Sequence, residues 1–353
     1  MDAATILVAV FLASVALSVA SSLLPYRSQG PVEDRVRKST LLAGLFMVIA
    51  VSLPALFLLG LADVVGAAGL AALVAFFAFQ YLVAPHLVVY GSQPASALGL
   101  GWLQETAERI AGSMGYKGRI QVRVAPSSEP NAYAVSALPA SYIVVTTSLL
   151  DTLDRDEVEA VLAHEVGHLH HRDNGYLVAT STWLVALEAL ARGVIAYLRN
   201  IVESMTYMAR MSTAYSPYYG LLYTVGLFLF LFIAAYISLI IAVVLAMIWL
   251  ANQAVKAFSR TREHMADLYS ARYTGDNRLI RSLEKIHKAY SRESTAREGK
   301  RSGRIVDPRR MLFIYPAFTS ILETLASTHP SLEHRRLIVE EYLREKGAPA
   351  ATS

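Results

Sequence analysis

The chain has 353 residues, of which 54% are hydrophobic and 17% are charged, and its formal net charge is +4. This composition is typical of a membrane protein with a polar portion and excludes an ordinary soluble globule. There are no cysteines, which excludes disulfides, iron–sulfur clusters, thiolate zinc sites and a cysteine nucleophile. The positive charge gathers beside apolar runs, so it indicates membrane orientation rather than binding to nucleic acid.

Five apolar runs are long enough to cross a hydrocarbon core of about 30 Å. They cover residues 5–24, 41–61, 66–89, 177–198 and 221–251. The chain starts without a basic region, which favours a first membrane span over a cleaved signal peptide. The loop at 26–40 is more basic than acidic, so the positive-inside rule places it in the cytoplasm. Everything between the third and fourth spans is then also cytoplasmic.

The polar stretch after the third run, residues 97–172, predicts a small α+β unit. Alternating apolar residues predict a strand at 119–124 and two more at 131–134 and 142–146. Amphipathic patterns predict helices at 98–114, 148–153 and 156–170, the last capped by Asp154 or Asp156. In the fourth apolar run, Glu188 and Arg192 are four residues apart, and we expect a structural ion pair there.

The last of these helices contains His164-Glu165-Val166-Gly167-His168, an HExxH sequence. On a helix, His164 and His168 stand about 6 Å apart along the axis on one face, so both imidazoles can bind one Zn²⁺. Glu165 projects beside them, where it can accept a proton from water. The motif therefore predicts a hydrolytic zinc site.

A catalytic zinc needs a third protein ligand, and the best candidate lies after the last apolar run. Glu263 and Asp267 are four residues apart, so one helix face presents both carboxylates. One can bind the metal while the other accepts the N–H of a ligand histidine. His264 is the rival ligand. The run at 221–251 spans about 46 Å as a helix, and its continuation could deliver Glu263 to the polar unit.

His164-Glu165-x-x-His168 followed by Glu263-x-x-x-Asp267 resembles the HtpX-like membrane zinc metalloproteases, which are relatives of the type I CAAX prenyl proteases. Two further motifs of that family have counterparts at Asn131–Ala134 and at His329-Pro330 with Arg335, and the likeness covers roughly residues 95–345. Here we count three apolar runs before the polar unit, whereas HtpX-type proteins usually have two. The resemblance implies one Zn²⁺ per chain, held by His164, His168 and Glu263. It also implies Glu165 as general base, Asp267 behind the ligands, His329 and Arg335 facing the substrate or the oxyanion, and Asn131, Ala132, Tyr133 and Ala134 pairing with substrate backbone.

We therefore expect an α+β, multi-span helical membrane protein. Its cytoplasmic zinc metalloprotease domain, of the gluzincin type, combines a small β-sheet with the HExxH and ExxxD helices. The expected regions are membrane helices (1–90), the first protease part (91–174), a membrane hairpin (175–258) and the second protease part (259–353).

The expected function is endopeptidase cleavage of membrane or misfolded proteins at the plasma membrane. A CAAX prenyl-type protease and a non-catalytic, zinc-stabilised scaffold or chaperone are the alternatives. A site-2-type intramembrane protease is disfavoured, because charged residues such as Asp151, Asp154 and Asp173 flank the HExxH sequence.

Overall fold

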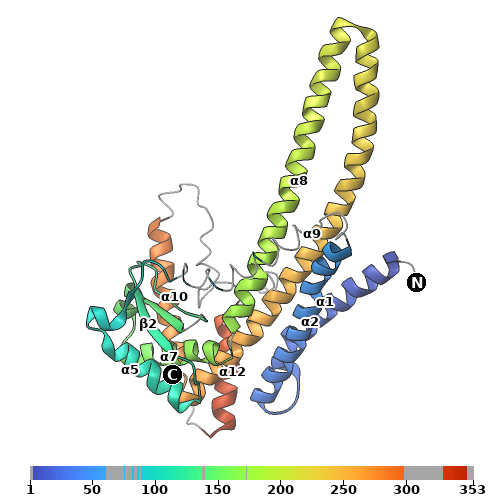
Figure 1. Ribbon diagram of the computed structural model, residues 1–353. Coiled ribbons are helices and arrows are strands. Elements are labelled where there is room, and N and C mark those ends of the chain that lie inside the picture. Colours follow the sequence, from blue (N-terminus) through green and yellow to red (C-terminus); the bar gives the residue numbers. More distant parts are fainter. Residues whose placement is uncertain are drawn as a thin grey trace.

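The computed structural model describes residues 3–60, 89–136, 140–171, 173–297 and 329–347, together with Ala75, Leu82 and His86. The chain forms a small α+β unit and a long helical hairpin, with two further helices against the base of the hairpin (Figure 1). The third apolar run lies almost entirely outside the described residues.

The α+β unit is built on a four-stranded mixed sheet with the order β1-β2-β4-β3. The strands are β1 (Gln93–Pro94), β2 (Ile120–Ala125), β3 (Ala132–Val135) and β4 (Ser141–Thr146). β2 and β4 are parallel, whereas β1 and β3 are antiparallel to their neighbours. One face of the sheet contributes Val122, Val124, Ala132, Ala134, Ile143 and Val145 to the main core. The predicted strands are confirmed, and β1 is an addition that the sequence pattern did not indicate.

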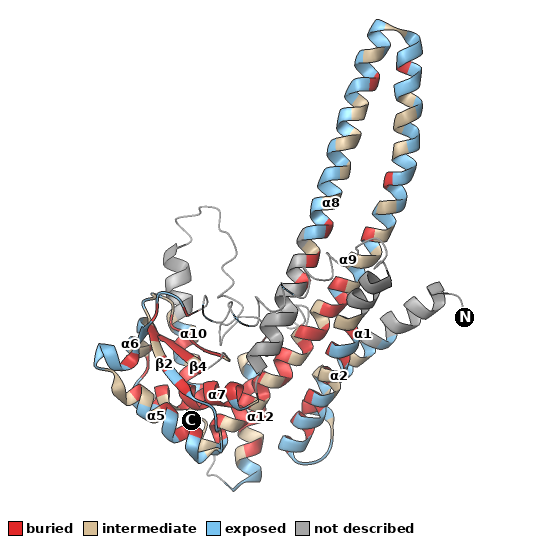
Figure 2. Ribbon diagram, viewed as in Figure 1, coloured by how far each residue is buried: buried red, intermediate tan, exposed pale blue. Residues whose placement is uncertain are grey.

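Helices cover that apolar face. After the 3-10 turn η1 (Ala95–Leu98), they are α5 (Gly101–Ser113), α6 (Thr147–Thr152) and α7 (Arg155–His170). Asp154 caps α7: its carboxylate accepts from the Glu157 amide at 3.0 Å, and the Glu157 carboxylate accepts from the Asp154 amide at 3.1 Å. This reciprocal cap fixes where the HExxH helix begins. Nearly all of α7 after its first turn is buried (Figure 2).

The hairpin consists of α8 (Asp173–Tyr215) and α9 (Pro217–Thr274), separated by Ser216 alone. Their 43 and 58 residues correspond to lengths of about 65 Å and 87 Å. Helix α8 continues well past the end of the fourth apolar run at residue 198. Among the described residues, α9 is the one helix long and apolar enough to cross a membrane.

The base of the hairpin packs against α1 (Ala3–Arg27) and α2 (Val32–Gly60), which contain the first apolar run and nearly all of the second. A separate apolar cluster joins α2, α8 and α9 through Phe46, Met47, Ala50, Leu184, Leu187, Ile248, Leu250, Ala251, Ala254 and Val255. The far half of the hairpin is mostly exposed (Figure 2), and Phe232 on α9 is 80% exposed. The ion pair expected in α8 is present, with Arg192 Nε 3.0 Å from Glu188 Oε1.

Helix α9 is unbroken from the apolar run to Thr274 and crosses the expected region boundary at 258/259. The helix extends from the hairpin into the α+β unit, where it packs along α7. Among the described residues, two further helices belong to the unit: α10 (Arg278–Arg297) and α12 (Leu332–Glu345). The Glu345 carboxylate accepts from the Val32 amide at the start of α2, and Glu341 pairs with Arg35 at 2.7 Å. These contacts anchor α12 to the start of α2.

Candidate metal centre

The two histidines of the HExxH sequence lie on the buried face of α7. His164 is 1% exposed and His168 is 9% exposed. Their Nε2 atoms face each other at 3.2 Å. The predicted one-turn spacing therefore brings both imidazoles to one point inside the protein.

Glu263 reaches the same point from α9. Its Oε2 lies 3.6 Å from His164 Nε2, and its Oε1 lies 3.4 Å from His168 Nε2. Burial alone would raise the pKa of Glu263, but the neighbouring histidines outweigh it and hold the pKa well below its ordinary value. Glu263 is thus ionised and adds a third donor to the histidine pair.

The three residues suit a zinc ion. One ligand atom from each of His164, His168 and Glu263 lies within 4.8 Å of the others. Two donors that share a tetrahedral Zn²⁺ at about 2.0–2.1 Å lie roughly 3.3–3.4 Å apart, close to the separations found here. In addition, Glu263 Oε2 is buried and makes no hydrogen bond to any described residue. A cation between the three donors would satisfy that oxygen, so the donor set fits the metal that the motif predicts.

Asp267 lies behind His164, one turn after Glu263 on α9. Its Oδ1 is 3.1 Å from His164 Nδ1 and its side chain is fully buried. Burial raises the pKa of Asp267, but Arg335 and His164 outweigh it and keep the pKa below its ordinary value. The carboxylate therefore favours a proton on His164 Nδ1, which leaves the Nε2 lone pair pointing at the metal position.

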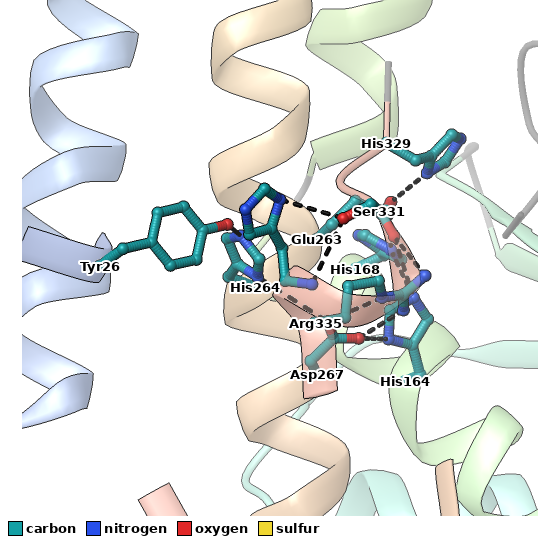
Figure 3. A network of polar contacts seen from close by, with 10 residues as sticks. Tyr26, His164, His168, Glu263, His264, Asp267, His329, Ser331 and Arg335 are labelled. Carbon is teal, nitrogen blue, oxygen red and sulfur yellow. Dashed lines mark hydrogen bonds and ion pairs between the residues drawn. The ribbon is translucent and has the colours of Figure 1, made fainter. Parts of the chain in front are cut away.

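Arg335, in the first turn of α12, holds both carboxylates (Figure 3). Its Nε donates to Asp267 Oδ2 at 2.9 Å, its Nη2 donates to Asp267 Oδ1, and its Nη1 lies 3.4 Å from Glu263 Oε2. The side chain is 1% exposed. One guanidinium between two carboxylates leaves a net negative site, which favours a divalent cation. Its contacts orient the carboxylates, and its expected role at the oxyanion stays a prediction.

His329 approaches from the segment before α12, with Nδ1 3.1 Å from Glu263 Oε1. The structure thus brings both parts of the His-Pro…Arg element to Glu263. Whether His329 contacts substrate or the oxyanion also stays a prediction.

Glu165 is 2% exposed. Burial raises the pKa of its carboxyl, and this effect exceeds the opposing influence of the two neighbouring histidines. A carboxylate with a raised pKa suits a group that must take up and release a proton near neutral pH.

The strand expected to bind substrate is β3, the last strand in the order of the described sheet. Asn131 precedes β3, and the backbone N–H of Asn131 donates to Thr146 Oγ1 at 2.8 Å. Ala132 and Ala134 face the core next to α7, so β3 packs against the HExxH helix. Pairing of this strand with substrate stays a prediction.

His264, the rival ligand, turns away from the histidine pair toward α1 (Figure 3). Its Nε2 lies 2.6 Å from the hydroxyl of Tyr26. Burial lowers the pKa of His264 to about 4, so the ring is neutral. We did not single out Tyr26 from the sequence, since nothing in its neighbourhood points to a partner 238 residues away.

Comparison with known proteins agrees with this geometry. The model for peptidase family M48 matches residues 98–341, which is more than half of the chain. The chain belongs to peptidase family M48. The matched part begins just after β1 and includes the histidine pair, Glu263, Asp267 and the His-Pro…Arg element.

Curated relatives of this M48 peptidase carry the name Protease HtpX homolog. The protein from Pyrobaculum aerophilum is 28% identical over 293 residues, covering 82% of this chain and 74% of the relative. The protein from Aeropyrum pernix is 33% identical over 246 residues, covering 69% of this chain and 68% of the relative. The expected HtpX-like family membership is therefore confirmed. A crystal structure of S. mikatae Ste24p aligns with 87% of this chain and 67% of its own, at 19% identity and a TM-score of 0.41.

Proposed function

We propose that this M48 peptidase is a membrane-embedded, zinc-dependent endopeptidase that cleaves membrane or misfolded proteins. The observation that carries the proposal is the double role of α9. This helix contains the most apolar segment of the described chain and also supplies Glu263 to the histidine pair. Hydrolysis would thus take place directly beside the bilayer, where membrane-protein segments emerge.

In this proposal, His164, His168 and Glu263 hold one Zn²⁺, and Asp267 keeps His164 in the required tautomer. Bound zinc polarises the peptide carbonyl and lowers the pKa of water toward ~7. Glu165 accepts a proton from the attacking water and passes it to the leaving amine. His329 or Arg335 stabilises the oxyanion, and the 131–134 strand holds the extended substrate through main-chain hydrogen bonds.

The membrane arrangement is part of the same proposal. Five crossings, with the α+β unit in the cytoplasm and the α8–α9 turn outside, follow from the apolar runs and from the basic loop at 26–40. Exposed apolar side chains along the far half of α9 support a lipid-facing hairpin. The plasma membrane is the proposed location.

A structural zinc site in a non-catalytic scaffold is less consistent with the donor set. Structural sites use four protein ligands, whereas catalytic sites use three and keep one position open. Within the described residues, the candidate metal cluster contains three donors, and Glu165 lies next to one of them in the sequence.

The decisive variant is Glu165→Gln in the purified full-length protein. The side chain keeps its size but cannot accept a proton, so we expect unchanged zinc content and loss of casein or membrane-substrate cleavage by about 10²–10⁴-fold. Glu263→Ala serves as the comparison, since it should lose zinc as well as activity. Cleavage retained by Glu165→Gln would rule out the proposed mechanism. Cleavage of a farnesylated peptide in preference to an unfolded membrane protein would favour a prenyl-type protease.

A further inference from the structure

Tyr26 lies in the last turn of α1, outside the part of the sequence that matches the M48 family, which begins at residue 98. Its hydroxyl is 2.6 Å from His264 Nε2. Its ring stacks on His334 of α12 with centroids 4.7 Å apart. One turn earlier, Ser22 Oγ accepts from Arg260 of α9 at 3.1 Å. The end of the first helix is thus fastened to the metal-site helix at two points, one of which is adjacent to Glu263.

A series of side-chain contacts, here called the path, leads from the Tyr26 hydroxyl through His264 and Asp267 to His164 at the metal position. His264 Nδ1 lies 4.0 Å from Asp267 Oδ2, which is an electrostatic contact and longer than a hydrogen bond. A neutral imidazole has one donor and one acceptor nitrogen. With the carboxylate on the Nδ1 side, Nε2 is the acceptor and the Tyr26 hydroxyl is the donor.

The path then continues through Asp267. Its other oxygen, Oδ1, lies 3.1 Å from His164 Nδ1, and the Nε2 of the same ring faces the metal position. Figure 3 shows the sequence of contacts, from Tyr26 on one side to His164 on the other. Each member is buried or partly buried, so water does not readily replace a lost partner.

We infer that Tyr26 is a positioning residue for the metal site. From the end of the first helix it fixes the His264 ring, and through that ring it fixes the Asp267 carboxylate that orients His164. The inference rests on the proposed zinc-dependent function. It means that the metal site of this chain extends beyond the peptidase unit into the first membrane helix.

The test is Tyr26→Phe in the full-length protein in detergent. Phenylalanine keeps the ring contacts and removes only the donor. We expect zinc to transfer to a chelator about tenfold faster than from wild type, at the low end of the effects known for outer-shell partners. We also expect kcat to fall while KM is unchanged, because Tyr26 does not touch substrate.

Tyr273→Phe is the matched control. Tyr273 lies on α9, ten residues after Glu263, and its hydroxyl donates to Glu159 at 2.7 Å. Its loss should leave zinc release as in wild type. In a His264→Phe background, adding Tyr26→Phe should accelerate release no further, since the path is already broken.

The possible outcomes distinguish a failure of the inference from a failure of the proposed function. If the wild-type protein binds zinc and Tyr26→Phe releases it at the same rate, the inference is wrong and the proposed function stands. Equal acceleration by Tyr26→Phe with and without His264 would also overturn the inference, because the effect would then follow another route. Wild-type protein that binds no zinc would overturn the proposed function and the inference together.

Discussion

Gly167 of α7 faces Ala266 of α9 so closely that a Cβ on Gly167 would lie 3.3 Å from the Ala266 Cα. It would also lie 3.1 Å from the Cβ of Tyr269. These atoms belong to, or are attached directly to, the backbone of α9, so they can yield only if the helices separate. The small residue inside the HExxH sequence therefore sets the distance at which Glu263 meets His168.

Gly167→Ala should push α7 and α9 apart by a few tenths of an ångström. Overpacking costs typically about 1–3 kcal/mol, which exceeds the gain of up to about 1 kcal/mol from helix propensity. We expect lower stability and weaker zinc retention, measured by thermal unfolding and chelator competition. Gly112→Ala in α5 is the control, since a Cβ there meets no described residue within 4 Å and the variant should be slightly more stable. Equal behaviour of the two variants would show that the helix contact is not limiting.

Asp267→Asn tests the tautomer argument. The amide can still contact His164, but it no longer carries the charge that favours a proton on Nδ1. Mutation of such partners typically costs 10- to 100-fold in metal affinity or activity, and we expect a loss in that range. Zinc affinity measured by competition at fixed pH provides the readout. Wild-type affinity in this variant would mean that another group orients His164.

Arg335 and Arg336 are neighbours in α12 with opposite surroundings. Arg335 is buried between Asp267 and Glu263, whereas the side chain of Arg336 is 46% exposed and pairs with Glu284. Arg335→Met leaves two buried carboxylates without their cation and should cost about 3–5 kcal/mol of unfolding free energy in zinc-free protein. Arg336→Met should cost less than about 1 kcal/mol, because exposed ion pairs contribute little. Denaturant unfolding of both variants makes the comparison, and similar losses would contradict it.

The natural absence of cysteine makes the membrane arrangement directly testable. Ser113→Cys, at the end of α5, should react with an impermeant thiol reagent only after the cells are opened. Ser216→Cys, in the α8–α9 turn, should react on intact cells. The opposite pattern would invert the proposed orientation, and labelling of both from outside would exclude the hairpin as a membrane crossing.

Local sequence patterns were sufficient for the elements that carry the chemistry. Apolar patterns predicted β2, β3 and β4, and the two cap candidates Asp154 and Asp156 placed the start of α7 to within two residues, because strand pleats and helix caps depend on neighbouring residues. The 31-residue apolar run was too long for a bilayer, which correctly indicated that α9 would continue to Glu263. The apolar runs did not indicate the end of α8, which continues past residue 198 to Tyr215, because polar and aromatic residues are compatible with a helix that packs along a partner.

The sequence by itself determined that two histidines and a carboxylate were available at spacings suitable for zinc. It also determined that the chain has the long apolar runs of a membrane protein. Only the tertiary structure decided which group of α9 reaches the histidines, since Glu263 and His264 are adjacent in sequence but point to opposite sides. It also decided that Arg335 holds the carboxylates and that Tyr26 joins the site. These contacts link segments separated by tens to hundreds of residues, and their geometry depends on how α1, α7, α9 and α12 pack. No local periodicity encodes that packing.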